Sequence, residues 1–154
     1  MARGTKLISD NRRARHDYEL LERFEAGIVL TGTEVKSLRA GQASLQHAFG
    51  QLRDGDAYLV GANIPEYPQA NRQNHDPDRD RKLLLHRSEI DRLTGQIHER
   101  GLTLVPTRLY FKDGRVKVEL ALARGKHVRD RRRDIADRDA RRQLERALKS
   151  RQFE

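Results

Sequence analysis

The sequence contains no cysteine and no tryptophan, and aromatic residues make up only 5% of its 154 positions. Without cysteine the chain can form neither a disulfide framework nor a thiolate metal site. Its longest purely aliphatic runs, 28–30 and 83–85, fall far short of the ~20 apolar residues that a membrane-spanning helix needs. Residues 1–10 also lack the apolar stretch of a secretory signal. These absences predict a cytoplasmic protein that does not enter a membrane.

The chain also lacks the common signatures of catalysis and cofactor binding. It has no GxSxG, no Walker-type loop and no HExxH, and its six histidines are scattered singly. Asp76, Asp78 and Asp80 have the spacing of a calcium loop. However, Arg81 and Arg87 stand where such a loop needs glycine and glutamate. We therefore predict no catalytic residue, no metal site and no cofactor, and an enzyme such as a nuclease is the weaker hypothesis.

Positive charge is abundant, and it lies at the two ends of the chain. The net charge is +9; residues 1–16 carry +4 and residues 124–154 carry +6, which leaves the centre near −1. A near-neutral centre with basic ends indicates contact with a polyanion, for which nucleic acid is the leading candidate. Because single-strand binders usually stack bases on aromatic side chains, the low aromatic content favours structured RNA.

Alternation and turn signals predict about six short strands. The expected strands are residues 18–30, 45–52, 57–63, 81–85, 103–112 and 115–123. Two Asp-Gly pairs, at 54–55 and 113–114, predict hairpins between the second and third and between the last two of these strands. In the last strand Lys117 alternates with apolar residues, so its charge is expected to face away from the core.

Two short helices are expected between the strands. Thr33 is the predicted cap of a helix over 34–40, and Ser88, with Asp91 at the capping-box position, is the predicted cap of a helix that ends at Gly101. Residues 65–79 contain three prolines and are expected to form a loop. Such a count fits a mainly β fold, an OB-fold-like antiparallel barrel of about six strands with two to three short helices.

The composition changes from residue 125 onward, where large apolar side chains become few. Acidic and basic residues spaced four apart, such as Glu145 and Lys149, favour a helix, and a narrow apolar stripe includes Leu144 and Leu148. We expect a basic arm at 1–16, a barrel at 17–124 and a basic tail at 125–154. The tail is expected to be disordered alone and helical when bound.

Several short segments follow one another in a defined order over nearly the whole chain. They are residues 11–18 (NRRARHDY), 25–27 (EAG), 32–39 (GTEVKSLR), 76–85 (DPDRDRKLLL), 125–126 (GK) and 130–132 (DRR). Each segment is a modest signal, but their order and spacing together resemble the SmpB family of tmRNA-binding proteins, also called SsrA-binding proteins.

The resemblance implies an RNA-binding adaptor of trans-translation that is not an enzyme. In that family an OB-like barrel binds the tRNA-like domain of tmRNA and places it in the A site of stalled ribosomes. The tail occupies the empty mRNA channel, and the nascent peptide is tagged for degradation. The partners implied are tmRNA and the ribosome, with elongation factor Tu acting indirectly through alanyl-tmRNA. The protein is expected to act as a monomer in a 1:1 complex with tmRNA.

The resemblance also assigns binding residues by position. Those expected to bind tmRNA are Asn11, Arg12, Arg13, Arg15, His16, Glu25, Lys36, Leu84, Lys117 and Lys126. Those expected to bind the ribosome through the tail are Asp130, Arg131, Arg132, Arg133, Ile135, Arg138, Arg141, Arg142 and Arg146. RNA contact is further expected from the short helix, through Glu34, Ser37 and Arg39. At Arg131 the family pattern has lysine, so the charge is kept while its geometry changes.

Some of these assignments have structural alternatives. Residues 11–16 could form a frayed basic arm, Glu25 could be a structural ion pair, and Leu84 could belong to the core. For the whole protein, the alternative function is that of another structured-RNA-binding barrel, such as a translation factor or an RNA chaperone.

Overall fold

The computed structural model describes residues 4–125 and 138–149, and the chain divides into two compact units, Met1–Arg124 and Gly125–Glu154. The strands of the first unit are β1 (Thr5–Asp10), β2 (Tyr18–Ile28), β3 (Phe49–Arg53), β4 (Asp56–Val60), β5 (Arg81–Leu84), β6 (Thr103–Lys112) and β7 (Arg115–Gly125). Its helices are α1 (Arg12–Asp17), α2 (Gly32–Arg39), the 3-10 helix η1 (Pro68–Gln73) and α3 (Arg87–Arg100). Residues 138–149 of the second unit form a helix. None of the helices in the described ranges is long and apolar enough to span a membrane.

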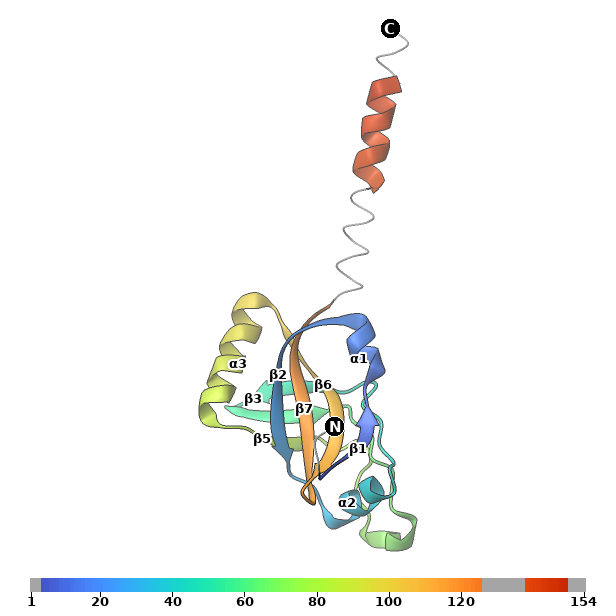
Figure 1. Ribbon diagram of the computed structural model, residues 1–154, viewed down its shortest axis with the longest axis vertical. Helices are drawn as coiled ribbons and strands as arrows, with labels where there is room; N and C mark the ends of the chain where they lie inside the picture. Colours follow the sequence, from blue (N-terminus) through green and yellow to red (C-terminus); the bar gives the residue numbers. More distant parts are fainter. Residues whose placement is uncertain (1–3, 126–137, 150–154) are drawn as a thin grey trace. The chain divides into compact units, whose positions relative to one another are not determined.

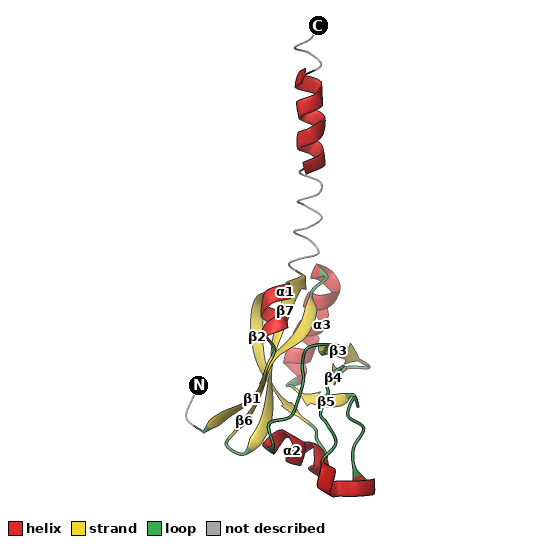
Figure 2. Ribbon diagram, turned by 90° about the vertical axis from the view of Figure 1, so that its right-hand side faces the viewer, coloured by secondary structure: helices red, strands yellow, loops and turns green. Residues whose placement is uncertain are grey.

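The strands form a closed barrel with one strand added at its edge. Their order is β1-β6-β3-β4-β5-β2-β7, and β7 pairs back onto β6, so six strands close into a ring. The second half of β6 pairs with β1, and the first half pairs with β3 at Leu104. Helices α1 and α2 lie toward opposite ends of the barrel, and α3 lies along its side (Figures 1 and 2). The predicted mainly β barrel with short helices is confirmed, with one strand more than expected.

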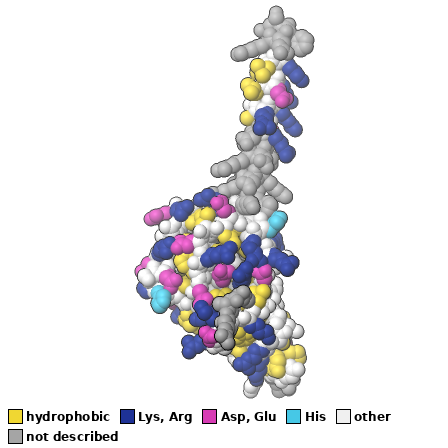
Figure 3. Space-filling view, viewed as in Figure 1, with side chains coloured by type: hydrophobic (Ala, Val, Ile, Leu, Met, Phe, Trp, Pro, Cys, Tyr) yellow, Lys and Arg dark blue, Asp and Glu magenta, His cyan; other side chains and the backbone are white. Residues whose placement is uncertain are grey.

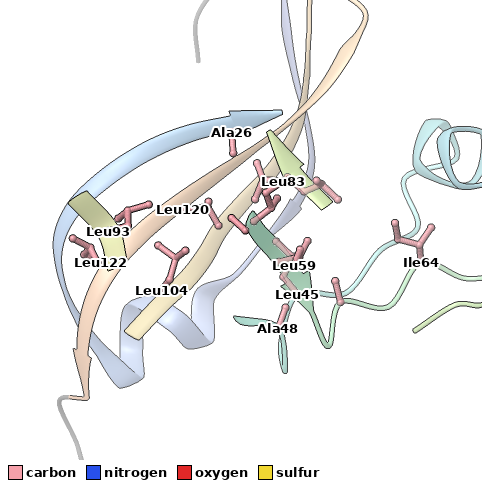
Figure 4. Close-up of a cluster of buried hydrophobic side chains, with 14 of the residues drawn as sticks. Ala26, Leu45, Ala48, Leu59, Ile64, Leu83, Leu93, Leu104, Leu120 and Leu122 are labelled. Atoms are coloured by element: carbon pink, nitrogen blue, oxygen red, sulfur yellow. The ribbon is translucent and has the colours of Figure 1, made fainter. Parts of the chain in front are cut away.

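Leucines and alanines from all sides of the barrel fill its interior. Leu59, Leu83, Leu104 and Leu120 are at most 2% exposed and lie in one cluster with Ala26 (Figure 4). A smaller cluster under α1 joins Ala14 to Val105, Ala121 and Ala123. The two hairpins form as predicted, because both residues of each Asp-Gly pair adopt the positive φ that tight hairpin turns need.

Both predicted helix caps were wrong. Thr31, not Thr33, caps α2: its hydroxyl accepts from the Glu34 amide, and the Glu34 carboxylate accepts from the Thr31 amide at 2.8 Å. Likewise α3 is capped at His86, whose amide donates to the carboxylate of Glu89 at 3.1 Å, and not at Ser88. In each case a glutamate three residues into the helix selects the first residue.

The sequence did not predict β1 and α1, which occupy most of the segment expected to be an arm. A strand of six residues and a helix of six residues are too short to show a clear period. The strand predicted to begin at 45 begins at Phe49 instead. Residues 45–48 form a turn, because the Ala48 amide donates to the Leu45 carbonyl at 2.9 Å.

Candidate RNA-binding surfaces

One candidate surface lies on the outer faces of four neighbouring strands, β5, β2, β7 and β6. We call it the strand surface, and its residues are Glu25, Leu84, Tyr110, Lys112 and Lys117. Side chains alternate along β2 and β5, so Ala26 and Leu83 are buried while Glu25 and Leu84 point outward. Lys117 of β7 pairs with Tyr110 of β6. Glu25, Leu84 and Lys117, which were assigned to tmRNA binding one by one from the sequence, therefore lie on one face of the barrel.

The carboxylate of Glu25 is held by its neighbours on the strand surface. It accepts a hydrogen bond from the Tyr110 hydroxyl at 2.5 Å and lies 3.2 Å from the ammonium of Lys112. The Tyr110 bond, followed by Lys112 and the charge of Lys117, lowers the pKa of Glu25 below its usual value. Glu25 is thus ionised near neutral pH, and it forms the structural ion pair that the sequence left as an alternative. It also remains part-exposed, so the two roles are compatible.

Leu84 provides an apolar patch on the same surface. It is 53% exposed, whereas its neighbour Leu83 is 2% exposed, so the alternative of a core role for Leu84 was wrong. Leu84 pairs with Gly27 across β5 and β2, and a Cβ at position 27 would lie 3.2 Å from the Leu84 Cβ. The missing side chain at Gly27 gives Leu84 room to lie close to the sheet.

Asn11 holds α1 onto the barrel. Its side chain is almost fully buried: Nδ2 donates to the carbonyls of Leu45 at 3.1 Å and Pro106 at 2.8 Å, and Oδ1 accepts from the amide of Ala14. These bonds satisfy both amide hydrogens and cap the helix. Direct contact of Asn11 with RNA stays a prediction, but its geometry favours an indirect role through the position of α1.

The basic residues of α1 differ in how they are engaged. Arg13 pairs with Asp17 at 3.2 Å, and Arg15 pairs with Asp10. His16 lies 3.0 Å from Asp17, whose pKa is lowered first by the hydrogen bond with His16 and then by that with Arg13. Arg12 is exposed and has no ion-pair partner within the described residues. Arg12 is therefore the α1 cation best placed to meet a phosphate.

Helix α2 is fixed by a buried ion-pair network. Glu34 and Arg81 are fully buried, and the Glu34 carboxylate lies 2.5 Å from both Arg81 and Arg79. Burial raises the pKa of Glu34, but hydrogen bonds from Arg79, the Thr31 amide and Arg81 outweigh it and hold the pKa below its usual value. Arg81 also donates to the carbonyl of Ala62 at 2.9 Å. Glu34 thus shapes the fold around α2 and is not available to RNA.

The other residues singled out on α2 divide into two groups. Ser37 is buried and donates to the carbonyl of Pro65 at 2.5 Å. Lys36 and Arg39 are exposed, and the Lys36 ammonium lies 5.7 Å from the centre of the Tyr67 ring. Of the α2 residues assigned to RNA contact, Lys36 and Arg39 are therefore the two that remain accessible to a ligand.

The helix at 138–149 exposes every residue, including Arg138, Arg141, Arg142 and Arg146. Its basic side chains gather on one side, and its apolar side chains lie on another (Figure 3). Residues 138–149 thus form a helix as expected, whereas disorder of the tail in the absence of a partner stays a prediction. However, no ion pair within 4.0 Å forms among residues 138–149, so the expected Glu145–Lys149 pair is absent. The remaining assigned tail residues lie outside the described residues: Lys126, Asp130, Arg131, Arg132, Arg133 and Ile135.

Sequence inspection missed two members of the strand surface, Tyr110 and Lys112. The turn at 113–114 could have indicated both residues, because a two-residue hairpin loop fixes which residues of its two strands lie opposite each other. Lys112 pairs with Arg115, and counting back two residues pairs Tyr110 with Lys117. The same face could therefore have been assembled from the sequence once the hairpin was recognised.

Comparison with known proteins identifies close relatives. A sequence model of the SmpB protein family matches residues 8–150. The chain is 58% identical over 145 residues to the SsrA-binding protein of Salinispora arenicola, a match that covers 94% of this chain and 91% of that protein. It is 56% identical over 148 residues to the SsrA-binding protein of Pelotomaculum thermopropionicum, covering 96% and 97% of the two chains.

A solved structure is similar as well. It is described as "tmRNA-SmpB: a journey to the center of the bacterial ribosome", and the matching chain is 54% identical with a TM-score of 0.65. The match covers 77% of this chain and 83% of that chain. Family model, relatives and solved structure thus agree over most of the sequence.

Proposed function

Because the chain belongs to the SmpB family, we propose that it is an RNA-binding adaptor of trans-translation. It binds the tRNA-like domain of tmRNA and places that RNA in the A site of a stalled ribosome, and the nascent peptide is then tagged for degradation. The observation that carries the proposal is the convergence of Glu25, Leu84 and Lys117 on the strand surface. A cation, an apolar patch and a fixed carboxylate suit contact with phosphate, ribose and base edges of structured RNA.

The two units have different tasks in this proposal. The barrel, with α1 and the strand surface, binds tmRNA, and the basic tail from residue 125 onward lies in the empty mRNA channel. The arginines of the helix at 138–149 are exposed and have no ion pair with another described residue, which supports the second task, because such a channel is lined with RNA phosphates. Message and tail would compete for one volume, so only an empty channel admits the tail.

The protein itself performs no chemical step in this scheme. The RNA carries the alanine that receives the peptide, and the protein supplies position and charge. We infer a cytoplasmic monomer that binds tmRNA one to one and meets elongation factor Tu only through alanyl-tmRNA.

The proposal is tested by filter binding of the full chain to the isolated tRNA-like domain of tmRNA, with an elongator tRNA of similar length as competitor. The expected result is clear preference for the tRNA-like domain at 150 mM salt, where unspecific binding is weakened. Equal affinity for both RNAs would contradict the proposal and favour a general structured-RNA-binding module.

A further inference from the structure

A surface cavity beside α1 has an aromatic wall that the proposed contacts do not use. The cavity measures about 320 Å³ and lies between α1, the segment before β3 and the first residues of β6. Ala14, Ala48 and Val105 form its apolar floor, and His47 and Phe49 lie at its rim. Phe49 is 42% exposed, and it is the one aromatic residue among the large apolar side chains that the described residues expose. We call this cavity the α1 pocket.

The wall of the α1 pocket opposite α1 is fixed from two sides. Asn11 donates to the carbonyl of Leu45 at 3.1 Å, which ties the turn at 45–48 to the start of α1. On the other side, Gly61 has φ of 80°, and a Cβ there would lie 2.5 Å from the backbone oxygen of His47. Only glycine permits this approach. The pocket is therefore formed before any ligand arrives, which lowers the entropic cost of binding.

The chemistry of the rim suits a flat, uncharged ring. The guanidinium of Arg13 is held between Asp17, at 3.2 Å, and Nδ1 of His47, at 3.5 Å. Phenyl, imidazole and guanidinium planes are the groups on which proteins stack unpaired bases. The ionised carboxylate of Asp17 offsets the charge of Arg13 and disfavours a phosphate. With a volume near the lower end of the usual ~300–1,000 Å³ for small-ligand pockets, the site has room for a single base.

We propose that the α1 pocket binds one unpaired nucleobase of an RNA, stacked against Phe49 and Arg13. The proposal rests on the proposed function, because an adaptor between tmRNA and the ribosome brings α1 close to RNA. Both tmRNA and ribosomal RNA can supply an unpaired base, and their chemistry is the same at this site.

The pocket is tested by NMR titration of the full chain with adenosine 5′-monophosphate and, separately, ribose 5-phosphate. Only the compound with a base should shift the amide signals of Ala48 and Phe49. Phe49→Leu should weaken this binding about fivefold or more, since it removes the stacking ring. Leu7→Ala, which truncates an equally exposed side chain on β1, should leave it unchanged. Absent shifts, or equal shifts with ribose 5-phosphate, would overturn the proposal.

Binding of the Phe49→Leu variant to the isolated tRNA-like domain and to ribosomes with an empty A site then identifies the source of the base. Weaker binding to the first assigns the base to tmRNA, and weaker binding only to the second assigns it to ribosomal RNA. If the parent chain binds both the tRNA-like domain and the ribosome, and the variant binds them equally well, the pocket proposal is wrong. The proposed function is then unaffected. If the parent chain binds neither, the proposed function fails, and the nucleotide titration still decides the pocket.

Discussion

The barrel and the helix at 138–149 use their basic residues in opposite ways. In the first unit, most of the described arginines and lysines lie within 4.0 Å of a carboxylate, and two of them meet at the buried Glu34. Among residues 138–149 no such pair forms, and every side chain is exposed. Figure 3 shows the same contrast, with basic and acidic side chains interspersed on the barrel.

The contrast separates two uses of positive charge. A cation paired with a carboxylate within the fold fixes a segment, whereas a cation without a partner keeps its charge for a phosphate. On the described barrel, therefore, the cations without such a partner, such as Arg12 and Arg39, are better candidates for RNA contact than the paired ones. In the helix all of the basic residues are candidates.

The largest effect on the stability of the fold is expected where a cation of an ion pair is fully buried. Arg81→Ala leaves Glu34 as a buried charge with one partner fewer, and should lower the free energy of unfolding by about 3–5 kcal/mol. Urea denaturation measures the loss. The matched control is Arg92→Ala, which breaks an exposed pair with Glu22 and should cost about 1 kcal/mol or less. Equal losses would show that burial does not distinguish these pairs.

The Glu34 network should also make stability depend on pH. The folded pKa of Glu34 lies below its ordinary value of 4.5, so its contribution is fully present above that pH and is lost as the pH falls through the folded pKa. Unfolding measured between pH 7 and pH 3 should show this loss. In Glu34→Gln the free energy of unfolding should fall less steeply as the pH is lowered. An unchanged pH dependence would show that Glu34 does not cause the loss.

An intermediate effect is expected at Asn11, where an uncharged side chain holds the basic helix α1. Asn11→Ala leaves the carbonyls of Leu45 and Pro106 without their donor and removes the helix cap, at a cost of about 1–3 kcal/mol. Affinity for the tRNA-like domain, measured on the folded variant, should fall as well. Asn11→Asp keeps the cap acceptor but not the donor. If Asn11→Asp bound RNA like the parent chain while Asn11→Ala did not, the helix cap would suffice to position α1, without the bonds to Leu45 and Pro106.

A smaller effect, on RNA affinity and not on stability, is expected when a single cation of the strand surface is removed. Lys117→Ala should weaken binding to the tRNA-like domain by about 5- to 10-fold at low salt and reduce the slope of log K against log salt by about 1. Stability should change little. Lys82→Ala is the matched control, because Lys82 lies on β5 with Asp56 as its partner at 3.8 Å. If both variants lost the same affinity for the tRNA-like domain, an ion-pair partner would not distinguish structural cations from RNA-binding cations.

The sequence carried more information on the barrel than on the surfaces. Asp-Gly turns and alternating side chains are local signals, and they predicted both hairpins and the outward direction of Lys117. The role of Asn11 could not be predicted, because its partners Leu45 and Pro106 are distant in sequence and carry no side-chain pattern. The burial of Glu34 is equally non-local. Local patterns thus found the elements, and long-range hydrogen bonds decided which of the assigned residues remain exposed.

The smallest effect on folding and on tmRNA affinity is expected from the helix at 138–149. Replacing Arg141, Arg142 and Arg146 together by glutamine keeps helix propensity and removes no ion pair among the described residues. The free energy of unfolding should therefore change by less than about 0.5 kcal/mol. Affinity for the tRNA-like domain should stay within about twofold, because these cations meet the ribosome in our proposal and not tmRNA.

Tagging of peptides on stalled ribosomes is the readout that should fail in this triple variant. A matched triple on the barrel, Arg23, Arg53 and Arg87 to glutamine, removes the same charge from exposed paired sites and should leave tagging intact. If the helix variant lost tmRNA affinity as Lys117→Ala does, both basic regions would serve the same RNA. The unpaired state of the helix would then indicate no separate partner, and the division of labour between the two units would be wrong.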